Sequence, residues 1–355
     1  VKSVAFPTPN YLNNGGDPKP EFTGSIPQLG SGSYNGSFSD GEGKNISGYS
    51  GGGNYYDKAG TTSGVAGVTQ GLIGSDYDDM LDLLSNQDDY QFNVLLTPGL
   101  FDKVHASQTT TAINNTQTRG DNIYVLDPVV YGSTIVNATG QGDARNTSYA
   151  AMYWPWLQTF EPDSGKNVWV PASTMMGGVY AFNDSVSEPW FAPAGINRGG
   201  LTNVIRPERK LSQGNRDTLY EANINPIASF PGTGTVVYGQ KTLQKQASAL
   251  DRVNVRRLLI ALKSYIGQVA QTLVFEQNTA ATRNNFLAAV NPYLESVQQR
   301  QGLYAFKVVM DDSNNTPDVI DRNQLIGAIY LQPTKTAEFI ILDFNVLPTG
   351  ATFPV

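Results

Sequence analysis

The sequence contains no cysteine and a single histidine, His105. The lack of cysteine excludes disulfide scaffolds, thiolate-ligated zinc and thiol catalysis. No apolar run approaches the ~20 residues that a membrane-spanning helix needs. Charged residues make up only 15% of the chain, the formal net charge is −7, and no basic stripe is present. We therefore expect neither insertion into a membrane nor binding of nucleic acid through phosphate contacts.

Glycine, proline and apolar residues are plentiful. The 355 residues include 36 glycines and 20 prolines, and 40% of them are hydrophobic. This composition predicts many turns and short strands, with enough apolar surface for two or three domains. The chain begins with Val1 rather than methionine, and we interpret it as starting inside a longer polypeptide.

The first part of the chain differs from the rest. Residues 1–70 are rich in Gly, Ser, Tyr and Asn, and we predict a remnant of a Gly/Tyr-rich β domain or loops on the outside of the molecule. Residues 71–190 are predicted to form an α/β domain. Buried strands are expected at 92–99, where Pro-Gly would end the strand, and at 123–128, with a helix between them at about 102–118.

Residues 191–355 are predicted to form a C-terminal domain with an extended arm. One helical face carries an apolar stripe made up of Val255, Leu258, Leu259, Leu262, Ile266, Val269 and Leu273. A second helix is expected from Thr282, as N-cap, to Gly302. Pro292 lies inside this helix and should kink or shorten it.

After Gly302 the apolar period changes to two. Strands are expected at 304–310, 325–331 and 337–346. The last is apolar on both faces, through Phe339, Ile340, Ile341, Leu342, Phe344 and Val346. The prediction is a multi-domain α+β or mixed α/β fold, in which two main helices pack on a C-terminal sheet.

The candidate catalytic motifs are weak. His105 has no second histidine or cysteine to act with, so a packed or solvated side chain is the better interpretation. The Gly48-x-Ser50-x-Gly52 match to a nucleophile elbow lies in a Gly-rich stretch and lacks the strand and helix that such a turn needs. The acidic pairs fit other roles. Asp78-Asp79, together with Asp76, fits the N-terminus of a helix, and Asp311-Asp312 fits a turn. We expect no enzyme activity, cofactor or metal.

The aromatic content permits two interpretations. The 18 tyrosines, 15 phenylalanines and 4 tryptophans could form carbohydrate-binding platforms, or they could supply protein interfaces, where these rings are favoured. A carbohydrate-binding or depolymerising phage surface protein therefore stands as an alternative to a structural protein.

From about residue 148 onward, consecutive blocks of sequence resemble the tail sheath proteins of contractile-tailed phages, closest to the T-even-like group. These blocks include Ser148–Trp156, Val168–Ser173, Trp190–Gly199, Val237–Thr242, Asp251–Leu258, Asn314–Asn323 and Ala337–Ile340. Type VI secretion sheaths and R-type bacteriocin sheaths are the nearest alternatives.

The resemblance implies a structural subunit that polymerises into a helical sheath of six-fold layers around a tail tube. Contraction of the sheath would drive the tube through the host envelope during genome delivery. The implied partners are other copies of the chain, the tail tube protein, and the baseplate and tail terminator proteins. The implied location is the virion, after assembly in the host cytoplasm.

Two contact sites follow as hypotheses. Arg252, Arg256 and Lys263 flank the apolar stripe and are predicted to contact the tube or a neighbouring subunit, with a solvated helix face as the alternative. The apolar residues of 337–346 listed above are predicted to form a strand shared between subunits, because a free apolar edge can be satisfied by strand addition.

Overall fold

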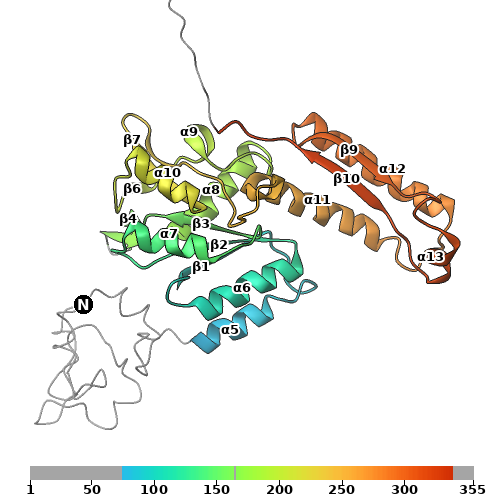
Figure 1. The fold of residues 1–355 in the computed structure, drawn as a ribbon, viewed down its shortest axis with the longest axis horizontal. Helices are drawn as coiled ribbons and strands as arrows, with labels where there is room; N and C mark the ends of the chain where they lie inside the picture. The colour runs from blue at the N-terminus through green and yellow to red at the C-terminus, as the bar shows by residue number, and fades with distance from the viewer. Residues whose placement is uncertain (1–73, 164, 339–355) are drawn as a thin grey trace, which may run out of the picture.

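A computed structural model describes residues 74–163 and 165–338. These residues form a layered central unit and an elongated C-terminal unit that projects to one side of it (Figure 1). The predicted N-terminal remnant (1–70), the Gly48-x-Ser50-x-Gly52 match and the strand residues 339–346 lie outside the described residues.

The central unit is built on a five-stranded sheet with the order β1-β2-β3-β7-β8. The first four strands run parallel and β8 is antiparallel to β7. A three-stranded antiparallel sheet, β5-β4-β6, flanks this sheet. The strand bounds are β1 Val94–Phe101, β2 Ile123–Asp127, β3 Ala150–Trp154, β4 Leu157–Glu161, β5 Lys166–Val170, β6 Val204–Pro207, β7 Ile224–Phe230 and β8 Gly234–Val237.

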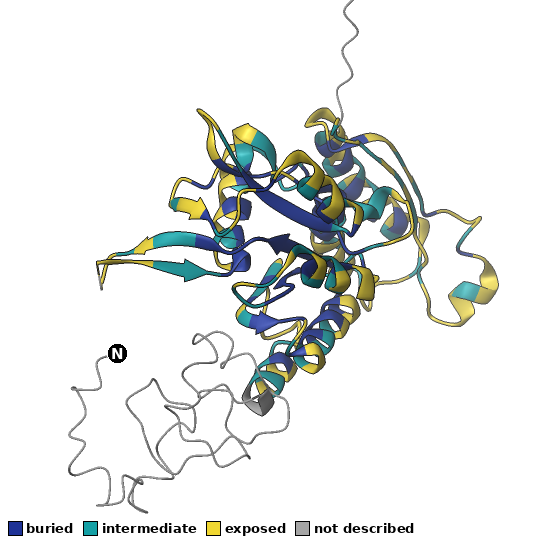
Figure 2. Ribbon diagram, turned by 60° about the vertical axis from the view of Figure 1, so that its left-hand side comes forward, coloured by how far each residue is buried: buried dark blue, intermediate teal, exposed yellow. Residues whose placement is uncertain are grey.

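Both faces of the main sheet are covered, because the inner strands β2 and β3 are buried at every position. Along β2, Tyr124 and Leu126 pack into one core, and Ile123 and Val125 pack into the other. The strands are accordingly buried at the centre of the unit in Figure 2. The helices of the unit are α5 Gly74–Leu83, α6 Ala106–Arg119, α7 Ile135–Ala144, α8 Ala172–Val186, α9 Gly195–Arg198 and α10 Gln213–Glu221.

The predicted strand–helix–strand unit is present, with one correction. Strand β1 continues through Pro98 and Gly99 to Phe101 instead of ending at them. β1 lies at the edge of its sheet, where a proline is tolerated, and its register with β2 shifts between Leu96 and Phe101. Gly99 has a φ of 101°, which allows the chain to bulge and then resume pairing.

The central sheet extends beyond residue 190, where we predicted a domain border. β7 pairs in parallel with β3, through Met152↔Ile224, so residues 224–237 share a sheet with residues 123–154. A strand that returns to its sheet after some seventy residues leaves no local signal in the sequence, and the C-terminal unit therefore begins at the helix after β8.

The C-terminal unit matches the predicted two helices on a sheet. It contains α11 Val253–Gln271, α12 Ala280–Gln299, β9 Leu303–Val309, α13 Pro317–Asp321 and β10 Ala328–Pro333, preceded by the 3-10 turn η2 Ala249–Asp251. The N-cap of α12 is Thr279, whose hydroxyl accepts from the N–H of Thr282; the prediction of Thr282 as the cap was wrong. Pro292 lies within α12 and does not shorten it.

Candidate interaction surfaces

The sheet of the C-terminal unit has two strands, β9 and β10, paired antiparallel. Within residues 74–163 and 165–338 no third strand pairs with it, so each strand has one edge without a ladder partner. A two-stranded sheet is only marginally stable alone, and its free N–H and C=O groups can pair with another chain. The two edges are therefore the first candidate interaction surface.

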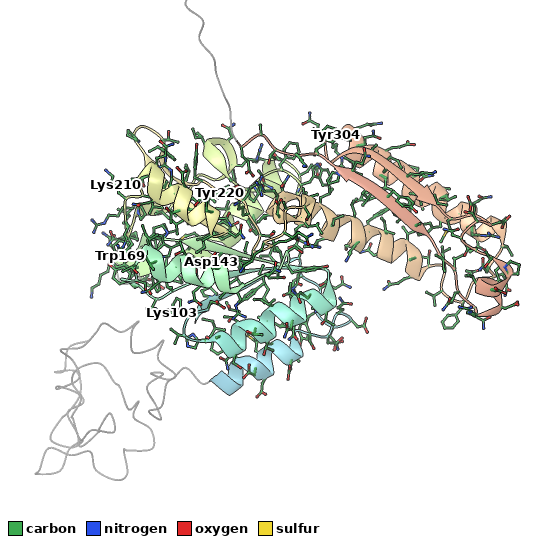
Figure 3. All side chains as sticks on the ribbon, viewed as in Figure 1. Lys103, Asp143, Trp169, Lys210, Tyr220 and Tyr304 are labelled. Carbon is green, nitrogen blue, oxygen red and sulfur yellow. The ribbon has the colours of Figure 1, made fainter. Side chains whose placement is uncertain are left out.

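The two faces of this sheet differ in what they contact. Phe306, Val308, Ile329 and Leu331 pack against the core that α11 and α12 share. Tyr304 and Tyr330 are 65% and 62% exposed, and Tyr304 lies at the outer margin of the unit in Figure 3. One face thus holds the sheet on the helices, while the two tyrosine side chains stay exposed. On β9 the backbone oxygen of Tyr304 accepts from Nε2 of Gln298 at 2.8 Å.

Helix α11 connects the two units because it belongs to both cores. Val253 and Ile260 pack into the core of the central unit. Leu258 and Leu262 pack with Phe286 and other residues into the core of the C-terminal unit. A helix that packs into both cores fixes the two units to each other.

The three predicted cationic contact residues have different surroundings. Arg252 pairs within the chain with Glu338, at 2.7 Å, and with Asp251, at 3.2 Å. Arg256 is buried, donates to the backbone oxygen of Ser148 at 3.1 Å and lies over the Tyr149 ring.

Lys263 is exposed and lines a groove of about 810 Å³ between α11 and the loop before β1. Of the three residues, Lys263 is the most exposed, and its Nζ donates to the hydroxyl of Tyr149 at 3.4 Å.

Sequence reasoning missed the residues that bind Arg252. Glu338, which accepts from Arg252, lies far from it in the sequence. Tyr220 and Gln240 also donate to the carboxylate of Glu338, and they come from a third region of the chain. Glu338 lies in the block Ala337–Ile340 and Gln240 in the block Val237–Thr242, but neither block indicated that the two residues would meet. These four residues come together because the chain after β10 folds back onto the central unit.

The side chains with candidate catalytic character have structural roles. His105 is buried, and its Nδ1 accepts from the N–H of Phe101 at 3.1 Å. Burial lowers the pKa of His105, because it disfavours the charged imidazolium. Asp311 accepts from the N–H of Ser313 at 2.8 Å, which confirms the predicted turn.

Asp127 is a buried carboxyl at the end of β2. It accepts from the N–H and the hydroxyl of Ser173 at 3.0 and 2.5 Å, and so caps the start of α8. Burial raises the pKa of Asp127 to about 7, and the Ser173 bonds only partly oppose this. Among the described residues no His, Asp and Glu side chains gather into a metal-binding group, and none of the described helices has the length and apolarity of a bilayer span.

Comparison with known proteins shows which proteins share this architecture. Residues 74–243 match the phage tail sheath protein central domain, and residues 245–347 match the phage tail sheath C-terminal domain. The tail sheath protein of Vibrio phage KVP40 is 41% identical over 208 residues, which cover 59% of this chain and 31% of the relative. The tail sheath protein of Enterobacteria phage T4 is 39% identical over 208 residues, covering 59% and 32%.

Solved structures agree with these matches. The sheath complex of an extracellular contractile injection system in its contracted state has a TM-score of 0.63 and 27% identity, covering 75% of this chain and 74% of that one. The contracted helical sheath of the anti-feeding prophage has a TM-score of 0.62 at 23% identity, covering 77% and 76%; this second likeness concerns the fold.

In this architecture a layered α/β unit is joined to a second unit, in which α11 and α12 pack on a small open sheet, and α11 belongs to both. This is the architecture of a contractile-sheath subunit. The chain belongs to the phage tail sheath protein family, in its T-even-like group. It spans about a third of the length of the curated relatives it matches.

Proposed function

We propose that this chain acts as a structural subunit of a contractile tail sheath. The subunits polymerise helically around a tail tube, and contraction of the polymer drives the tube through the host envelope during genome delivery. Family membership supports a structural rather than an enzymatic role. The partners we propose are other copies of the chain, the tail tube, the baseplate and the tail terminator, in a virion assembled in the host cytoplasm.

The observation that carries this proposal is the open β9–β10 sheet, whose edges lack a third strand in the described part of the chain. Strand addition from a neighbouring subunit satisfies such edges with main-chain hydrogen bonds and needs no cofactor. The predicted donor is the apolar segment 339–346. Each subunit then gives one strand and receives another, and this links the polymer while the subunits move.

Electron microscopy of truncated chains tests this proposal. Deletion of residues 339–355 removes the predicted strand, and deletion of 347–355 is the matched control because it removes only the segment after it. We expect striated tubes from the intact chain and the control, and soluble folded subunits from the longer deletion. Tubes of normal length from the longer deletion would refute the shared strand.

A related contractile injection system is the second candidate. The likeness to the sheath of an extracellular contractile injection system favours it, and R-type bacteriocin and type VI secretion sheaths belong to the same class of machine. Purification of the native particle separates the candidates, because a phage tail carries a genome-filled capsid and the other assemblies do not.

A further inference from the structure

The segment after β10 crosses from the C-terminal unit back to the central unit. We call residues 334–338 the strap. Its first residue is held on the C-terminal unit: the N–H and the hydroxyl of Thr334 donate to the backbone oxygens of Gly302, at 3.2 Å, and Gln301, at 2.6 Å. Thr336 is held on the central unit, because its hydroxyl oxygen accepts from Nε2 of Gln240 at 2.5 Å.

The strap ends on a carboxylate with three donors. Oε1 of Glu338 accepts from Nε of Arg252 at 2.7 Å and from Nε2 of Gln240 at 3.1 Å. Oε2 accepts from the hydroxyl of Tyr220 at 2.7 Å. The donors come from the residue before α11, the segment after β8 and the last turn of α10, where Figure 3 marks Tyr220. The carboxylate thus connects three elements.

Burial along the strap alternates. Thr334, Thr336 and Glu338 are half-buried, whereas Lys335 and Ala337 are exposed. One side of the strap therefore makes all the contacts above, as expected of a segment laid on a surface that fits it.

A second layer of contacts holds the donors in place. Arg252 also pairs with Asp251 at 3.2 Å. Nζ of Lys241 donates to the backbone oxygen of Tyr220 at 2.7 Å and lies 4.4 Å from the centre of its ring. Burial by itself would raise the pKa of Glu338, but the hydrogen bonds and the charge of Arg252 lower it overall. The donors are thus oriented toward an ionised carboxylate.

We propose that Glu338, with Arg252, Tyr220 and Gln240, forms a clamp that fixes the point and direction at which the C-terminal arm, residues 339–355, leaves the subunit. The clamp deepens the proposed function, since it matters for assembly only if the arm pairs with a neighbour. An arm that starts from a fixed point loses less conformational entropy when it docks, so it adds to the sheath more readily.

Distance measurements on the full chain test the clamp. The natural sequence has no cysteine, so spin labels can be placed at Lys335→Cys on the strap and Val136→Cys on α7, both exposed positions. Pulsed electron paramagnetic resonance should give one narrow distance distribution for the otherwise unchanged chain. Glu338→Gln and Arg252→Gln should each broaden it, with the undocked fraction rising by about tenfold or more.

Three controls accompany these variants. Tyr220→Phe removes one donor and keeps the ring, and should broaden the distribution less. Glu295→Gln removes an exposed carboxylate of α12 and should change nothing. A label pair at Val136→Cys and Lys166→Cys, within the central unit, should stay narrow in every variant that keeps its fold.

Tube formation by the same variants separates the clamp from the proposed function. Broadening together with slower or sparser tube growth supports the clamp. An unchanged strap distance in both Glu338→Gln and Arg252→Gln overturns it, whether or not tubes form. Broadening of the strap distance with normal tube growth overturns the role of the clamp in assembly. If the unchanged chain forms no tubes while its strap distance stays narrow, the result contradicts the proposed function instead.

Discussion

The guanidinium of Arg256 lies 3.9 Å from the centre of the Tyr149 ring. The same side chain donates to the backbone oxygen of Ser148, so the first turn of α11 is fixed to the residues that precede β3. This contact lies in the interior of the molecule. It shows that part of the cationic character of α11 serves to join the two units rather than to meet a partner.

Arg256→Met should therefore destabilise the chain. The substitution keeps an apolar stem but leaves the Ser148 carbonyl without its donor and removes the cation–π contact, which together correspond to about 1.5–3 kcal/mol. Lys263→Met is the matched control, because it removes from the same helix an exposed cation whose one long contact, at 3.4 Å, is with the Tyr149 hydroxyl, and it should change stability by less than about 0.5 kcal/mol. Chemical denaturation of both variants checks this; equal stability would contradict the structural role of Arg256.

Two glycines of α7 should respond in opposite ways to alanine. A Cβ on Gly142 would lie 2.1 Å from the backbone oxygen of Ala222, whereas a Cβ on Gly140 would meet nothing within 4 Å. Gly142→Ala should therefore cost about 1–3 kcal/mol or more through overpacking. Gly140→Ala should stabilise by about 0.5–1 kcal/mol through helix propensity. Thermal melts of the pair test how closely α7 approaches the chain after α10.

The buried carboxyl of Asp127 predicts a pH dependence of stability. Its pKa in the folded chain is about 7, above its ordinary value of 3.8, so the folded state binds more protons than the unfolded state between these values. The free energy of unfolding contributed by this group should then fall as pH rises from about 4 to 7. Denaturation of Asp127→Asn across this range should show a flatter slope than the unchanged chain, and an identical slope would contradict the assignment.

The sequence predicted elements whose signals are local. The apolar runs at 92–99 and 123–128 indicated strands, and the stripe from Val255 to Leu273 indicated α11, since each depends on a short window of residues. The pairing of β7 with β3 could not be predicted, because it depends on a return of the chain over a long distance.

The candidate interaction surfaces, like the fold, could be predicted only where their signal is local. The charges of Arg252 and Arg256 were visible, but their partners Glu338 and Ser148 come from distant segments. The sequence therefore could not show that Arg256 is buried and that Arg252 is paired within the chain, while Lys263 on the same flank stays exposed. The inter-subunit strand at 339–346 stays a prediction, as it lies beyond the described residues.

Lys263 is the residue through which the predicted tube or neighbour contact can now be tested. Lys263→Glu reverses a charge on the open groove beside α11 and should weaken co-sedimentation of the sheath with its tube. Because exposed ion pairs contribute about 0–1 kcal/mol each, we expect a few-fold effect that grows at low salt. Lys166→Glu, an exposed lysine on β5, is the control, and equal co-sedimentation of the two variants would remove Lys263 from the interface.

The most direct test of the account is a cryo-electron microscopy map of the polymer formed by this protein. We expect continuous main-chain density for a strand from a neighbouring subunit along a free edge of the β9–β10 sheet. In that neighbour, residues 339–346 should be traceable from its Glu338 into this strand. A map in which both edges of the sheet face solvent, or are covered by a helix, would contradict the claim that shared strands hold the sheath together.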